Sequence, residues 1–136
     1  MAAKKHLSRH LLPNGLTVEF YDLSRPTAGD RWQVVVEARV AVPVSPEHLP
    51  PELRDRAEEV RAALGPEVSF IKQEIRNFIA VGEVPDLVQN IASQLFASIR
   101  GYLGHPEFAP RFLRKKYQEY CERQTWWRDT AESQEE

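Results

Sequence analysis

The residues best suited to chemistry lie near the C-terminus, where cationic and aromatic side chains share one helical segment. Cations there could neutralise phosphates while the rings stack on bases, which predicts a nucleic-acid-binding module as one function. The cations are Arg111, Arg114, Lys115 and Lys116, and the aromatic residues are Tyr117, Tyr120, Trp126 and Trp127. The same pattern is typical of an amphipathic helix whose charged face is solvated and whose aromatic face packs in a core. Both interpretations stay open.

Two other groups of residues could support metal or nucleophilic chemistry. His6 and His10 are four residues apart, a spacing that can hold a metal ion on a helix, but a zinc site needs three or four ligands and none follows nearby. Cys121 with His105 could form a thiolate and imidazole pair, yet no third group that would orient it can be identified. We therefore predict no catalytic residue, no metal site and no cofactor.

The element that must position any site is the segment 31–44. Its apolar residues alternate with polar ones, which predicts a strand with one face on a core and a charged face that is largely wet. The apolar face consists of Trp32, Val34, Val36, Ala38, Val40 and Val42, and the charged face of Arg31, Gln33, Glu37 and Arg39. A second strand is predicted over 16–21, directly after the turn signal Pro13-Asn14-Gly15.

The remaining elements complete an α+β fold. Residues 53–64 carry apolar side chains at helical spacing, and residues 67–81 fit either a helix or a strand, of which the strand is favoured for its β-branched content. We predict a three-stranded, mostly antiparallel sheet (ββαβ) with the strand 67–81 beside the strand 16–21. Two C-terminal helices, 84–103 and one that begins after Pro106, are predicted to pack on one face of the sheet.

Length and composition predict one domain. The chain has 136 residues, 42% of them hydrophobic, and a formal net charge of −2. This is enough for a core without disulfides and gives no overall attraction to nucleic acid. We predict a flexible basic arm over 1–10, a single domain over 11–128 and a disordered acidic tail over 129–136. The charged N-terminus does not resemble a signal peptide, and no apolar run suits a membrane span, so we expect a cytoplasmic protein without membrane contact.

The feature that bears most on function is the helix 84–103, because the side opposite its apolar stripe lacks charge. A freely solvated helix usually carries charges there, so an uncharged side predicts contact with another protein surface. The candidate interface residues are Gln89, Asn90, Ser93, Gln94 and Ala97. We expect a non-enzymatic interaction or assembly module that self-associates, with a homodimer or another protein as partner. A small enzyme with a pocket between sheet and helices is the third hypothesis, for which Glu74, Arg76 and His105 are the candidates.

Overall fold

The computed structural model describes residues 4–134, which divide into two compact units. Unit 1 contains residues 4–41 and Ser69–Pro106, and unit 2 contains Val42–Val68 and residues 107–134. The sequence predicts one domain over 11–128, whereas the residues of the structure pack into these two units. The strands β4 (Arg31–Pro43) and β5 (Glu67–Ala80) contribute residues to both units, because the units divide after Ala41 and before Ser69.

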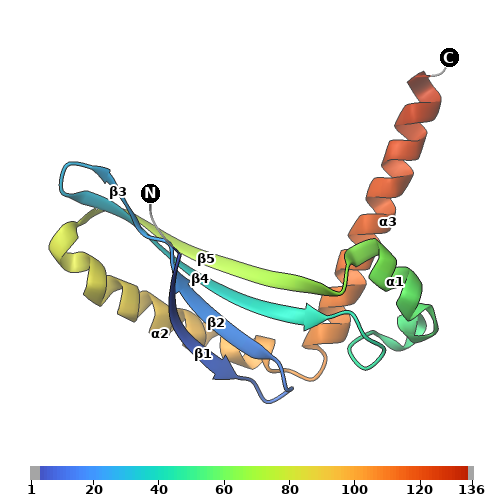
Figure 1. Ribbon diagram of the computed structural model, residues 1–136, viewed down its shortest axis with the longest axis horizontal. Coiled ribbons are helices and arrows are strands. Elements are labelled where there is room, and N and C mark those ends of the chain that lie inside the picture. Colours follow the sequence, from blue (N-terminus) through green and yellow to red (C-terminus); the bar gives the residue numbers. More distant parts are fainter. Residues whose placement is uncertain (1–3, 135–136) are drawn as a thin grey trace. The chain divides into compact units, whose positions relative to one another are not determined.

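Within the described residues, unit 1 is built on an antiparallel sheet of five strands (Figure 1). The strands are β1 (Lys5–Leu11), β2 (Thr17–Asp22), β3 (Arg25–Ala28), β4 (Arg31–Pro43) and β5 (Glu67–Ala80). The α+β class and the extended conformation of residues 67–80 are therefore confirmed. The predicted number of three strands is wrong, because β1 and the short β3 were not expected.

The predicted strand order is also wrong, since β4 and not β2 lies in the middle. On one side β4 pairs with β2 and with β3, and on the other side it pairs with β5. The backbone N–H of Val44 donates to the carbonyl oxygen of Pro66 at 2.9 Å. The residue before β5 therefore lies next to the residue after β4. The insertion of η1 (Pro51–Arg56) and α1 (Ala57–Leu64) therefore joins antiparallel neighbours and does not form a crossover.

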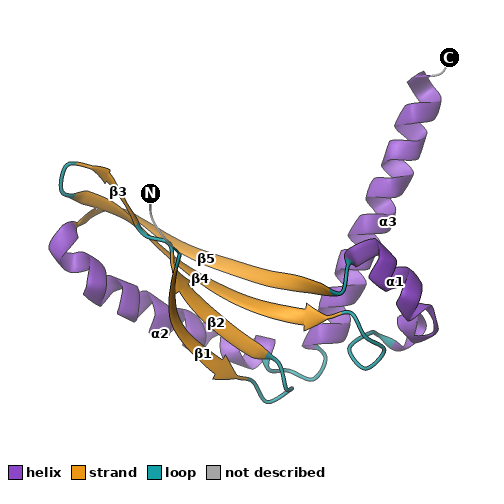
Figure 2. Cartoon of the chain, viewed as in Figure 1, coloured by secondary structure: helices purple, strands orange, loops and turns teal. Residues whose placement is uncertain are grey.

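One helix of unit 1, α2 (Val84–Leu103), covers one face of the sheet (Figure 2). Its buried stripe consists of Val84, Val88, Ile91, Leu95, Ile99 and Leu103. The predicted apolar face of β4 is buried from Val34 to Val42, and Phe20 of β2 lies on the same side, with its ring centroid 5.9 Å from that of Phe96. The other predicted helix, α3 (Phe108–Gln134), belongs to unit 2.

The N-terminal segment is a strand and not the flexible arm predicted for residues 1–10. Residues 5–11 form β1, which pairs antiparallel with β2, while residues 1–3 lie outside the described residues. The two leucines of β1 explain this only in part, because Leu7 is half-buried and Leu11 is exposed. His10 instead stacks on Phe96 at 4.3 Å between ring centroids. An imidazole therefore takes the place of an apolar side chain, and a pattern of apolar residues cannot reveal it.

The turn between β1 and β2 holds the end of α2. The side-chain amide of Asn14 donates to the carbonyl oxygens of Leu103 at 2.7 Å and His105 at 3.1 Å, and its Oδ1 accepts from the backbone N–H of Leu16 at 3.1 Å. Carbonyl groups at a helix C-terminus have no partner within the helix. Asn14 thus supplies donors to α2 from a distant part of the sequence.

Unit 2 is held by contacts of α3 with η1 and α1. Arg114 donates through two nitrogens to the carboxylate of Glu52, and Arg56 donates to Glu59 at 2.9 and 3.1 Å and to the Tyr117 hydroxyl at 3.3 Å. The sequence predicts a disordered tail over 129–136, but α3 continues to Gln134. Each added helical residue forms one more backbone hydrogen bond, and alanine, glutamate and glutamine favour a helix. Residues 135–136 lie outside the described residues.

Phe78, near the end of β5, has a strained backbone. Its φ is 59°, a left-handed conformation that is an outlier for a bulky residue, and 78% of the residue is exposed. We expect Phe78→Asn to raise the free energy of unfolding by roughly 1 kcal/mol, because asparagine tolerates this conformation and little burial is lost. Urea denaturation measures the change. Phe78→Val should be destabilising, and equal stability of the two variants would contradict the strain.

Candidate interaction surface at β5 and α2

The strand β5 has a long free edge. Among the described strands only β4 pairs with it, so one side of its 14 residues carries backbone groups without a strand partner. Two large apolar residues on it are half exposed, Ile71 at 47% and Ile75 at 45%. Proteins usually shorten, twist or cover such edges, because an exposed edge is a template for pairing with another chain. The edge of β5 is therefore the first candidate for an interaction surface.

The contacts of β5 show which side chains lie on which face. Gln73 donates to Glu37 at 3.0 Å, and Asn77 accepts from Gln33 at 3.0 Å. Because side chains alternate along a strand, Ile71 and Ile75 lie on this same face, which we call the open face. The alternate residues of β5, among them Glu74 and Arg76, point to the side of α2.

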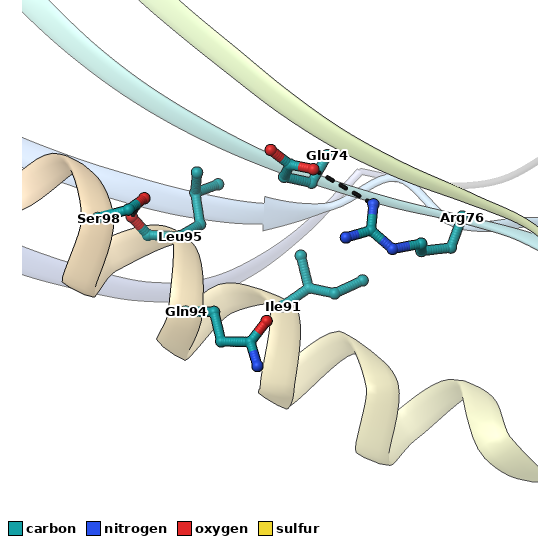
Figure 3. A pocket seen from close by; sticks show the side chains of 6 residues that line it. All are labelled: Glu74, Arg76, Ile91, Gln94, Leu95 and Ser98. Carbon is teal, nitrogen blue, oxygen red and sulfur yellow. Dashed lines mark hydrogen bonds and ion pairs between the residues drawn. The ribbon is translucent and has the colours of Figure 1, made fainter.

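Glu74 and Arg76 line a pocket together with residues of α2 (Figure 3). The α2 residues that line it are Ile91, Gln94, Leu95 and Ser98. Its volume of about 240 Å³ is below the roughly 300 to 1,000 Å³ of ordinary small-molecule sites. A guanidinium nitrogen of Arg76 lies 3.2 Å from the Glu74 carboxylate, so the two charges in the pocket satisfy each other. His105, the third residue of the enzyme hypothesis, does not line it.

The pocket shows which flank of α2 lies beside β5. All five predicted interface residues are exposed, and Gln94 among them lines the pocket with Ser98. Asn90 and Ala97 lie one turn to either side of Gln94 and share its flank. Gln89 and Ser93 lie about 100° or more further round the helix, on the side away from β5. The structure thus brings one flank of the uncharged part of α2 and the free edge of β5 to one side of unit 1.

The open face carries a cluster of charges, on a face that the alternation in 31–44 predicts to be largely wet. Glu37 is only 3% exposed, because neighbouring side chains cover it. One carboxylate oxygen accepts from Gln73, and the other lies 3.2 Å from Arg39 and 3.6 Å from Lys4, with no hydrogen bond from the described residues. The expectation of a wet face is therefore wrong at Glu37. Besides Arg39 of the same strand, its neighbours come from two other segments, Lys4 before β1 and Gln73 of β5, so a single-strand pattern contains little signal for the cluster.

Tyr21 of β2 lies at the rim of this cluster. The Lys4 ammonium lies 4.1 Å from the centroid of the Tyr21 ring and forms a cation–π contact with it. Its hydroxyl donates to Glu19 at 2.8 Å, and this hydrogen bond, followed by burial, raises the pKa of Tyr21 above its usual value. The charges of the cluster are paired with one another, although Glu37 Oε2 and Arg39 Nε are buried without a hydrogen bond from the described residues.

The cations predicted to contact nucleic acid lie in α3, and two of the four are engaged. Arg114 is paired with Glu52, and this hydrogen bond lowers the pKa of that carboxyl. Lys116 lies 3.7 Å from Glu119, whereas Arg111 and Lys115 are exposed. Of the aromatic residues predicted to stack on bases, Tyr117 is buried and Trp126 is exposed, and the side chain of Trp127 lies outside the described part.

The two histidines lie on opposite faces of the sheet. The ring of His6 meets Tyr21 at 5.3 Å, whereas the ring of His10 contacts Phe20 and Phe96 on the α2 side. A register shift between His6 and Ser8 reverses the alternation. Within residues 4–134, no three His, Cys, Asp or Glu side chains gather closely enough to hold a metal ion.

Comparison with known proteins gives no assignment. No protein-family model, curated protein or solved structure matches the chain. None of the helices in the described part combines the length and the apolar character that a membrane crossing requires. Function must therefore be argued from the surface of the molecule itself.

Proposed function

We propose that this chain is a non-enzymatic assembly module that forms a homodimer through the free edge of β5 and the adjoining flank of α2. The observation that carries the proposal is the long unpaired edge of β5, beside which α2 presents residues without charge. Backbone groups on such an edge gain partners when a second chain pairs with it.

The side chains of this surface support the same function. Ile71 and Ile75 offer apolar area next to the edge, and Asn90, Gln94 and Ala97 place no charge that a partner would have to desolvate. Interface centres are depleted in charged residues relative to the rest of a protein surface. Catalysis is not part of the proposal, since the pocket beside Gln94 is small and its two charges are paired with each other.

Gln94→Arg tests the proposal by adding a charge to the flank of α2. We expect the dimer to dissociate at least tenfold more readily, because burying an unpaired guanidinium is costly. Ser93→Glu, one residue away and turned about 100° from the β5 side of the helix, should have a smaller effect in the same direction. Light scattering over a concentration series measures the mass.

A matched control for this experiment is Gln118→Arg, the same change at an exposed position of α3. It should leave the dimer intact. A dimer that resists Gln94→Arg would remove this flank of α2 from the interface, and a wild-type protein that is monomeric at all concentrations would end the proposal.

A further inference from the structure

We infer that two copies of the chain pair their β5 strands antiparallel, with Gln73 facing Gln73 of the second copy. The inference rests on the proposed function and deepens it, because it names the strand, its direction and the register. The paired segment is 69–77, which lies within unit 1 and ends before the left-handed residue Phe78. The partner at this edge is a second copy, because the charges and apolar residues of β5 complement those of the same strand in the antiparallel direction.

On the open face, this register places apolar residues opposite apolar residues and polar residues opposite polar residues. Ile71 of each copy lies opposite Ile75 of the other, so two apolar pairs flank the central glutamines. Ser69 lies opposite Asn77, which pairs two uncharged polar residues. Both isoleucines are half exposed in the isolated chain, and directly opposed β-branched pairs stabilise antiparallel sheets.

On the α2 side, the same register pairs opposite charges. Lys72 of each copy lies opposite Glu74 of the other, and Arg76 lies opposite Phe70. Within one chain Glu74 already contacts Arg76, so in the dimer each carboxylate would lie between two cations. The side chains of the two faces do not contact each other, and the same register gives favourable pairs on both.

Neighbouring registers lose this match. A centre at Lys72 or Glu74 places two like charges directly opposite each other and sets isoleucine against a polar residue, which is unfavourable on both faces. A centre at Ile75 keeps one charge pair, Glu74 with Arg76, but requires Phe78 to pair with Lys72. The backbone of Phe78 has a φ of 59°, which does not suit a regular ladder.

Charge reversal tests the register with two variants of the full chain. In Lys72→Glu the dimer has two glutamate pairs, and in Glu74→Lys it has two lysine pairs. We expect each variant alone to dissociate roughly tenfold more readily than the wild type. An equimolar mixture should form a heterodimer of nearly wild-type affinity, because each copy then meets the opposite charge. Analytical ultracentrifugation of each variant and of the mixture measures this, and misfolding cannot explain rescue by mixing.

Cysteine cross-linking tests the same geometry without changing charge. In a Cys121→Ser background, which removes the exposed native thiol, Ile71→Cys and Ile75→Cys are made separately. Directly opposed residues of an antiparallel pair lie about 4.5 to 5.5 Å apart at Cα, within disulfide range. Oxidation of the mixture should give a cross-linked dimer, and oxidation of either variant alone should not.

The outcomes separate the register from the proposed function. If Ile75→Cys cross-links by itself, or if Lys72→Glu is as dimeric as the wild type, the register is wrong while the assembly function stands. If the wild type is monomeric at all concentrations, both are wrong. Rescue by mixing together with cross-linking of the mixture alone would establish the register.

Discussion

Arg39→Met is expected to lower the free energy of unfolding by about 2 to 3 kcal/mol, although Arg39 lies on a strand face that the sequence suggests is solvated. The substitution removes the cation 3.2 Å from Glu37 but keeps most of the aliphatic length of the side chain. Glu37 then keeps Lys4 and Gln73 as neighbours and loses its nearest charge. A buried carboxylate whose cation has been removed costs more than the pair itself contributed. Urea denaturation at neutral pH measures the difference.

Two further variants decide whether the cause is the buried charge. Arg39→Lys keeps a cation and should lose less than half as much stability. Glu37→Leu combined with Arg39→Met removes both charges and should recover most of the loss, since a matched apolar pair often replaces a buried ion pair at little cost. Equal stability of Arg39→Met and the wild type would show that Glu37 is not held as a buried anion.

The sequence predicts the elements of this protein better than their arrangement. The alternation in 31–44 locates β4 and its buried face, and the β-branched content of 67–81 correctly favours a strand, because both signals are local. The pairing of β5 with β4 joins residues that are far apart in the sequence, as does the hydrogen bond between Val44 and Pro66 just beyond the strands. Local periodicity contains no information on this pairing, and the predicted place of the strand 67–81 beside the strand 16–21 is therefore wrong.

Only one half of the candidate surface can be predicted from the sequence. The uncharged flank of α2 can be read from one helix, and all its predicted interface residues are exposed in the structure. The free edge of β5 cannot be predicted, since an edge is defined by a neighbour that is missing from the sheet. Knowing that β5 is an edge strand is what makes the order of Ile71, Lys72, Glu74 and Ile75 meaningful as a self-complementary pattern.

The second large effect is expected for Asn14→Asp, which should lower the free energy of unfolding by about 3 kcal/mol at neutral pH. Aspartate keeps the oxygen that accepts from Leu16 but loses the amide that donates to the carbonyl oxygens of Leu103 and His105. It also places a negative charge at the C-terminal, negative end of the α2 dipole. Thermal and urea denaturation of both proteins measure the loss.

The dependence of this loss on pH distinguishes charge from a missing hydrogen bond. Carbonyl oxygens beside the new carboxyl favour its protonated form, so its pKa in the folded state should exceed the usual value of about 3.9. A group with a raised folded pKa contributes stability below its unfolded pKa and loses that contribution as pH rises through the folded pKa. Asn14→Asp should therefore be closest to the wild type below about pH 4 and furthest from it at neutral pH. Asn14→Ala, which lacks the charge, should lose about 1 to 2 kcal/mol at either pH, and a parallel pH profile for the two variants would contradict the role of the charge.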